Sequence, residues 1–145
     1  MNNAPTTTKT KKALFWATTG LSVLALGGIG AADLARAPQM LAGLAHLGYP
    51  AYFAPILGAW KLAGVAALLA PGLPRLKEWA YAGFFFTLTG AAMSHAASGD
   101  PAGKILFPLV LLGVVMTSWA LRPARAAGVP GQATASPDLS AARRV

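Results

Sequence analysis

The chain alternates between four long apolar segments and short polar stretches. The apolar segments cover about residues 13–33, 51–70, 78–97 and 104–121. A helix needs about 20 apolar residues to cross the hydrocarbon core of a bilayer, and about 17 is the lower limit. The pattern therefore predicts an all-α integral membrane four-helix bundle over residues 13–122.

The third segment has the most clearly marked ends. Lys77 and Glu78 stand where a helix would leave the lipid headgroups, and Trp79 and Tyr81 carry the amphipathic rings that favour the interface. No formal charge then occurs before Asp100, and His95 lies close to the end of the segment. This sequence is typical of a membrane span with two defined interfaces.

The connections between segments are short. Residues 71–74 (PGLP) stop the second segment, and the next begins so soon that only a tight turn fits between them. The second and third segments are therefore predicted to be antiparallel neighbours. Residues 36–50 are mixed in polarity, but their larger apolar side chains recur at helical spacing, which predicts a short helix at the membrane surface.

The two ends of the chain differ from the middle. Residues 1–12 are polar and residues 123–145 are rich in Ala, Gly, Pro and Ser, so both are predicted to be disordered tails. A cleaved signal peptide is an alternative for the start, because a lysine-rich beginning and an apolar run precede the small residues at 35–37. The apolar run is longer than the usual signal core, which favours an uncleaved anchor.

Composition supports a membrane protein and narrows its chemistry. Of the 145 residues, 55% are hydrophobic and 11% are charged. There is no cysteine, which excludes thiolate catalysis, disulfides and cysteine-ligated clusters for this sequence. The net charge is +8, but the basic residues gather near the chain ends and in one short loop, without the basic face that nucleic-acid binding requires.

The distribution of basic residues predicts the orientation. Cytoplasmic loops of membrane proteins carry an excess of Lys and Arg. In the predicted topology, one side holds seven basic residues near the membrane: Lys9, Lys11, Lys12, Arg75, Lys77, Arg122 and Arg125. The other side holds Arg36 and Lys104. Both termini are therefore predicted to be cytoplasmic in a bacterial inner membrane, with Asp33, His46, His95 and Asp100 on the outer side.

Lys61 is the most informative single residue, because it falls near the middle of the second span. A charge at that depth costs about 2.5–3.5 kcal/mol and normally needs a partner. Gly58 and Gly64 leave room for another helix, so Lys61 is predicted to face the bundle. Glu78 is its predicted partner across the tight turn, and Tyr81 or Asp33 is the next candidate. Three interpretations stay open: a structural ion pair, a ligand or proton-handling site, and a lysine that reaches the surface unpaired.

Candidate cofactor ligands are few. His46 and His95 invite a haem or metal interpretation, but they are far apart in sequence and no second histidine or glutamate stands at ligand spacing. Interfacial histidines with ordinary hydrogen bonds are favoured, so no metal or cofactor is predicted and haem is disfavoured. A quinone remains compatible, because it needs only an apolar cleft with one or two hydrogen-bonding groups such as Tyr81, Lys61 or His95.

Several of these segments together carry a family resemblance. They are residues 47–50 (LGYP), 58–64 (GAWKLAG), 71–72 (PG), 76–84 (LKEWAYAGF) and 94–95 (SH). As a set they resemble the DoxX-like family of small four-helix bacterial membrane proteins, over about residues 12–123. The resemblance implies a four-helix membrane protein in a broader group named for a subunit of a quinone-linked oxidase. It implies no catalytic residue.

Three function classes follow from the sequence. The favoured class is a non-catalytic membrane subunit or a binder of a small lipophilic molecule. The alternatives are the membrane subunit of a quinone-linked oxidoreductase, acting with a redox protein partner, and a small transporter. The sequence lacks the paired histidines of a haem-bearing bundle, the Cys-x-x-Cys of a vitamin-K-reductase-like enzyme and the acidic residue deep in the first span of a small multidrug transporter.

Overall fold

The computed structural model describes residues 4–122, with side chains from Lys9 onward. This part of the chain contains helices and no strands, which confirms the all-α prediction. The helices are α1 (Ala4–Leu34), α2 (Pro38–His46), α3 (Phe53–Leu69), α4 (Pro74–Ala97) and α5 (Ala102–Leu121). The short α2 lies within the region predicted to form a surface helix.

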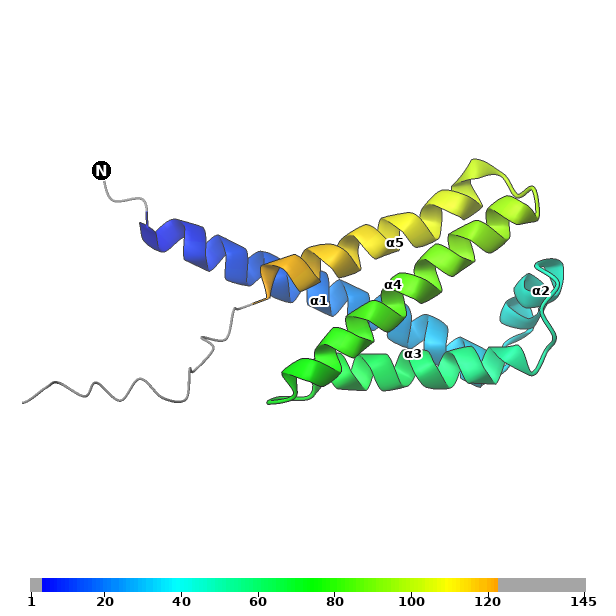
Figure 1. Cartoon of the computed structure of the whole chain (residues 1–145), viewed down its shortest axis with the longest axis horizontal. Helices are drawn as coiled ribbons and strands as arrows, with labels where there is room; N and C mark the ends of the chain where they lie inside the picture. The colour runs from blue at the N-terminus through cyan, green and yellow to red at the C-terminus, as the bar shows by residue number, and fades with distance from the viewer. Residues whose placement is uncertain (1–3, 123–145) are drawn as a thin grey trace, which may run out of the picture.

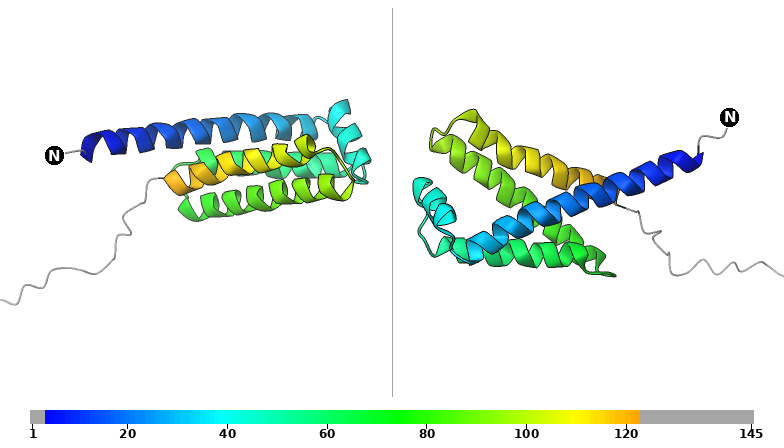
Figure 2. Two further views of the ribbon diagram at one scale, coloured as in Figure 1. Left: turned by 90° about the horizontal axis from the view of Figure 1, so that it is seen from above. Right: turned by 180° about the vertical axis from the view of Figure 1, so that it is seen from behind.

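The four long helices form a ring in which α1 packs against α3 and α5, and α4 packs against the same two helices. The short α2 contacts α1 and α3 at one end of the ring (Figure 2). In Figure 1, α3 and α4 meet at the turn between them and diverge toward the end at which α2 lies. The α3–α4 pair is thus closed at its turn and open toward the α2 end.

Length and composition make some of these helices suited to a membrane. Lys9–Leu34 within α1 and Ala102–Leu121 are long and apolar enough to cross one, and Phe53–Leu69 is apolar but shorter. Such helices suggest a small membrane protein.

Part of the interior of the ring is filled by buried apolar side chains, and we call this part the packed side. Its buried apolar side chains come from all four long helices, and they are Leu26, Leu68, Tyr81, Phe84, Leu88, Leu111 and Val115. Ser118 of α5 lies among them and forms hydrogen bonds with Thr19 of α1 (2.6 Å) and with the Tyr81 hydroxyl of α4 (2.9 Å). We call Thr19, Ser118 and Tyr81 the hydroxyl chain. These groups satisfy one another inside the bundle, as buried polar groups must.

Glycines bring α3 close to its two neighbours. A Cβ atom at Gly58 would lie 2.5 Å from the backbone nitrogen of Leu34 and 2.6 Å from the carbonyl oxygen of Gly30, so only glycine permits this approach of α1. A Cβ atom at Gly64 would lie 2.6 Å from the ring of Phe84 on α4. The expectation that Gly58 and Gly64 leave room for other helices is confirmed.

The beginning of the chain differs from the prediction. Residues 4–12 belong to α1, so the predicted disordered tail is wrong for them, while residues 1–3 lie outside the described part. Lysine is a good helix former, Pro5 lies in the first turn where its missing N–H is tolerated, and extending a nucleated helix is favourable. The predicted tail over residues 123–145 also lies outside the described residues.

Candidate functional site

Lys61 is paired with Asp33. The ammonium nitrogen of Lys61, midway along α3, lies 2.6 Å from a carboxylate oxygen of Asp33, near the end of α1. The two side chains are 12% and 5% exposed. The close contact at Gly58 allows this pairing. It brings the backbone of α1 against α3 at a position three residues before Lys61. The prediction that Glu78 is the partner of Lys61 is therefore wrong.

Glu78 points toward the opposite neighbour of α4. One of its carboxylate oxygens accepts a hydrogen bond from the indole nitrogen of Trp119 at 3.0 Å, and the other forms an ion pair with Arg122. Both partners are at the end of α5. The tight turn does make α3 and α4 neighbours, but Glu78 lies on the face of α4 that packs against α5 rather than α3.

A cavity of about 380 Å³ opens beside the Lys61–Asp33 pair. We call it the α2-side cavity, because α2 lines it together with α1, α3 and α4. Its lining is mainly apolar, with polar side chains from Asp33, Gln39, Tyr49, Lys61, Thr87, Ser94 and His95. An apolar cleft with a few convergent polar groups is the usual form of a small-molecule site.

A second hollow of about 380 Å³ runs between α3 and α4. We call it the α3–α4 groove. Its lining includes Trp60 and Trp79, and it shares Leu57, Lys61 and Thr87 with the α2-side cavity. Lys61 therefore stands where the two hollows adjoin.

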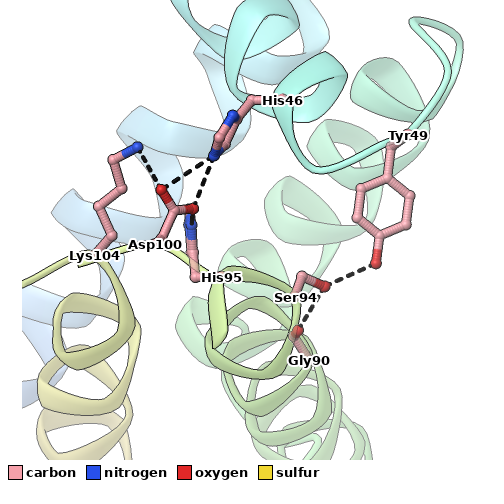
Figure 3. Close-up of polar contacts among 7 residues, drawn as sticks. All are labelled: His46, Tyr49, Gly90, Ser94, His95, Asp100 and Lys104. Atoms are coloured by element: carbon pink, nitrogen blue, oxygen red, sulfur yellow. Dashed lines mark hydrogen bonds and ion pairs between the residues drawn. The ribbon is translucent and has the colours of Figure 1, made fainter. Parts of the chain in front are cut away.

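Asp100 joins three helices at the α2 end of the bundle (Figure 3). Its carboxylate accepts hydrogen bonds from Nδ1 of His95 at 2.8 Å, from the ammonium of Lys104 at 2.8 Å and from Nε2 of His46 at 3.0 Å. Only 4% of the Asp100 side chain is exposed. The cluster fastens the end of α2 to the loop that connects α4 and α5.

The charge of Asp100 is favoured by these contacts. The hydrogen bonds from His95 and then Lys104 lower the pKa of the Asp100 carboxyl below its ordinary value, burial partly opposes them, and the bond from His46 makes a smaller lowering contribution. Hydrogen bonds to the charged form of a carboxylate have this effect.

The connection between α2 and α3 is fixed to α4 by a second contact. The Tyr49 hydroxyl lies 2.8 Å from Oγ of Ser94, which also donates a hydrogen bond to the carbonyl of Gly90 (Figure 3). The rings of Tyr49 and Phe53 stack at 5.0 Å. Tyr49, Phe53 and Ser94 all line the α2-side cavity, so this contact forms part of its wall.

The chain matches the model of the DoxX-like family over residues 17–118. It belongs to the DoxX-like family. The matched part runs from α1 to α5 and includes every residue that lines the α2-side cavity. No curated protein and no solved structure matches it.

The DoxX-like chain thus places its candidate residues in three separate environments. Asp33, Lys61 and His95 line the α2-side cavity, with His46 held at the same end by Asp100. Tyr81 belongs to the hydroxyl chain in the packed side and lines neither hollow beside Lys61. Glu78 of α4 is 45% exposed and lies beside the end of α5. Among the described residues, no group of three or more His, Cys, Asp or Glu side chains could hold a metal ion.

Sequence reasoning did not identify Asp100 and Ser118 of this DoxX-like protein as site residues. A signal for part of the Asp100 cluster exists: an acid five residues after His95 follows the Ser98-Gly99 helix end, and Lys104 stands four residues further on. The predicted orientation places His46 on the same side as Asp100, but their hydrogen bond depends on how α2 folds over the bundle. No local pattern distinguishes Ser118 from other serines in apolar helices.

Proposed function

We propose that this DoxX-like protein binds a small lipophilic molecule with a neutral polar head group in the α2-side cavity. The observation that carries the proposal is a mainly apolar cavity of about 380 Å³ with the buried Lys61–Asp33 pair in its wall. The role is that of a non-catalytic membrane subunit or binder.

The ion pair sets the chemistry of the head group. An ammonium has three N–H donors, and Asp33 accepts one of those of Lys61. A carbonyl or hydroxyl oxygen of a ligand can accept another, and a ligand N–H or O–H can donate to the carboxylate of Asp33. The pair carries no net charge, so a neutral head group leaves no uncompensated charge in the apolar cavity.

We further propose that the four long helices all cross the bacterial inner membrane, with both termini in the cytoplasm. The excess of basic residues near both chain ends and at the start of α4 supports this orientation. It places α2, Asp100 and the mouth of the cavity on the outer side. Reporter fusions test it: a fusion after Pro74 should report the cytoplasm and one after Asp100 the outside. The reverse pattern would contradict the topology.

A quinone is the second candidate ligand, and the distribution of polar groups in the cavity favours it. Lys61 stands on α3, whereas Tyr49, Ser94 and His95 come from the outer wall formed by the α2–α3 connection and α4. A quinone ring has two opposed carbonyl oxygens: one can accept from Lys61, and the other can accept from the Tyr49 hydroxyl when that hydroxyl turns from Ser94 to the ligand. In this case the protein would be the membrane subunit of a quinone-linked oxidoreductase and would act with a redox partner.

Native mass spectrometry of protein extracted in a mild detergent tests the proposed function. The wild-type protein should carry an added mass, and organic extraction followed by mass analysis would separate a quinone from another lipophile. Gly90 lines the cavity and has open space around its position, so Gly90→Leu should fill the cavity and remove the added mass.

Gly113→Leu is the matched control, because Gly113 of α5 is exposed, has open space around it and lines neither hollow. An added mass retained equally in Gly90→Leu and Gly113→Leu would overturn the assignment of the ligand to this cavity.

A further inference from the structure

The α3–α4 groove adjoins the α2-side cavity at Lys61. Leu57, Lys61 and Thr87 line both hollows, so these three side chains form the boundary at which the two hollows adjoin. A ligand head that bonds to Lys61 therefore lies at the entrance of the groove. The groove itself is mostly apolar, and Lys61 is the only charged residue in its lining within the part of the chain that the structure describes.

Small residues of α4 form one long floor beneath both hollows. They lie on one face of the helix at steps of three or four residues, with Gly90 and Ala91 adjacent, and they are Ala80, Gly83, Thr87, Gly90, Ala91 and Ser94. Fourteen residues separate the ends of this floor, which is about 21 Å at a helical rise of about 1.5 Å per residue. The shape of the combined space is therefore long and narrow.

The groove differs from the rest of the apolar surface. Lipid-facing positions of α5, such as Phe107 and Val110, carry bulky exposed side chains (63% and 67% exposed). At the groove, Gly83 of α4 and Ala63 of α3 leave a hollow between the exposed rings of Trp60 and Trp79 (74% and 78% exposed). The two rings flank a hollow that is open at the outside of the bundle, so a chain can enter it sideways from the bilayer.

We propose that the ligand is a single-tailed amphiphile whose polar head lies in the α2-side cavity and whose linear hydrocarbon tail occupies the α3–α4 groove. This inference rests on the proposed function, and it adds the class of the ligand and the position of its tail. A compact lipophile without a tail would occupy the α2-side cavity alone. The long floor, the shared residues and the lateral opening favour the tailed ligand.

Two probes with the same neutral head test the inference: octanamide and hexadecanamide. The amide carbonyl can accept from Lys61 and its N–H can donate to Asp33. Dissociation constants are measured by native mass spectrometry titration in one detergent, with the wild-type protein and the Gly83→Leu, Gly90→Leu and Gly113→Leu variants. Detergent partitioning of each probe is the same for every variant, so it cancels when variants are compared.

Gly83→Leu should fill the groove, because Gly83 lines it and a side chain there meets open space. We expect it to weaken hexadecanamide binding about tenfold, the loss that corresponds to exclusion of about two CH₂ groups, and to weaken octanamide binding less, because fewer of its CH₂ groups extend beyond Gly83. Gly90→Leu should weaken both probes, and Gly113→Leu neither.

The other outcomes separate the two proposals. If both amides bind and Gly90→Leu weakens both, but Gly83→Leu weakens neither or both equally, the tail groove is wrong and the cavity stands. If neither amide binds, or Gly90→Leu has no effect, the proposed function fails and the tail groove fails with it.

Discussion

The two sides of the bundle use buried polar groups in opposite ways. In the packed side, Thr19, Ser118 and Tyr81 bond to one another among large apolar side chains. In the hollow side, which contains the α2-side cavity and the α3–α4 groove, Lys61 and Asp33 bond to each other beside a cavity of about 380 Å³. Both sets are almost completely buried, but only the second has hydrogen-bonding capacity that faces empty space.

This difference separates a structural role from the proposed functional one. Polar groups that satisfy one another inside a packed core specify how helices associate. A buried ion pair adds little net stability, because replacing such a pair by apolar side chains is often neutral or stabilising. Its presence beside an apolar cavity therefore favours a role other than holding the fold together. On this comparison we propose that the hydroxyl chain serves assembly and that the Lys61–Asp33 pair serves ligand recognition.

The largest effect on stability is expected from Lys61→Met. The change leaves the carboxylate of Asp33 buried without its cation, and breaking a buried pair in this way costs about 3–5 kcal/mol. Equilibrium unfolding in mixed detergent micelles measures the loss. Lys12→Met is the control, because Lys12 is exposed on α1 and its removal should change the stability little. A loss no larger than that of the control would show that Asp33 does not depend on Lys61.

A smaller loss of stability is expected from Ser118→Ala, which removes the central member of the hydroxyl chain. Two hydrogen bonds disappear and the hydroxyls of Thr19 and Tyr81 lose a partner, at a cost of about 1–2 kcal/mol. The mass added to the protein in native mass spectrometry should not change. Loss of the ligand in Ser118→Ala would break the comparison, because it would place the packed side within the binding site.

Acid should weaken the attachment of α2 through Asp100. Because the pKa of this carboxyl is lower in the folded protein than its ordinary value of 3.8, the unfolded chain takes up the proton first as the pH falls. The contribution of Asp100 to stability is therefore complete above about pH 5 and is lost progressively below about pH 4. Thermal unfolding from pH 6 to pH 3 should show this loss, and Asp100→Asn should reduce the dependence on pH. An unchanged slope in Asp100→Asn would contradict the role of the cluster.

The smallest effect is expected from Glu78→Gln, because Glu78 is 45% exposed and exposed ion pairs contribute about 0–1 kcal/mol. Combined with Lys61→Met, its effect on the free energy of unfolding should be additive, since the two residues bond to different helices. A coupling larger than about 0.5 kcal/mol in this double-mutant cycle would show that Lys61 and Glu78 interact, which would contradict the pairing of Lys61 with Asp33 alone.

The sequence predicts the local features of the fold better than its long-range pairs. Helical periodicity indicates that Thr19, Ser22, Leu26 and Asp33 share an interior face of the first span, and all four are buried. Glycine spacing likewise places Lys61 toward the bundle. These conclusions depend on one helix at a time.

The partner of Lys61 depends on how two helices cross. A tight turn makes α3 and α4 neighbours, but it does not show which face of α4 meets α3, and Glu78 lies on another face. The chain reaches α3 from α1 through α2 and through Arg36, whose backbone is left-handed with φ 55°. No local sequence pattern predicts this conformation, so the packing of α1 against α3 could not be derived. The Asp100 cluster has the same cause, because His46 reaches it only after α2 has folded across the end of the bundle.

The central claim is that the Lys61–Asp33 pair serves the ligand rather than the fold, and the double variant Lys61→Met/Asp33→Leu tests it most directly. It replaces both charges with apolar side chains, so no charge is left unpaired. Unfolding and native mass spectrometry are measured on the same preparation. We expect the stability to return close to that of the wild-type protein while the added mass is absent. Recovered stability with the ligand still bound at wild-type occupancy would contradict the claim and leave the pair with a structural role.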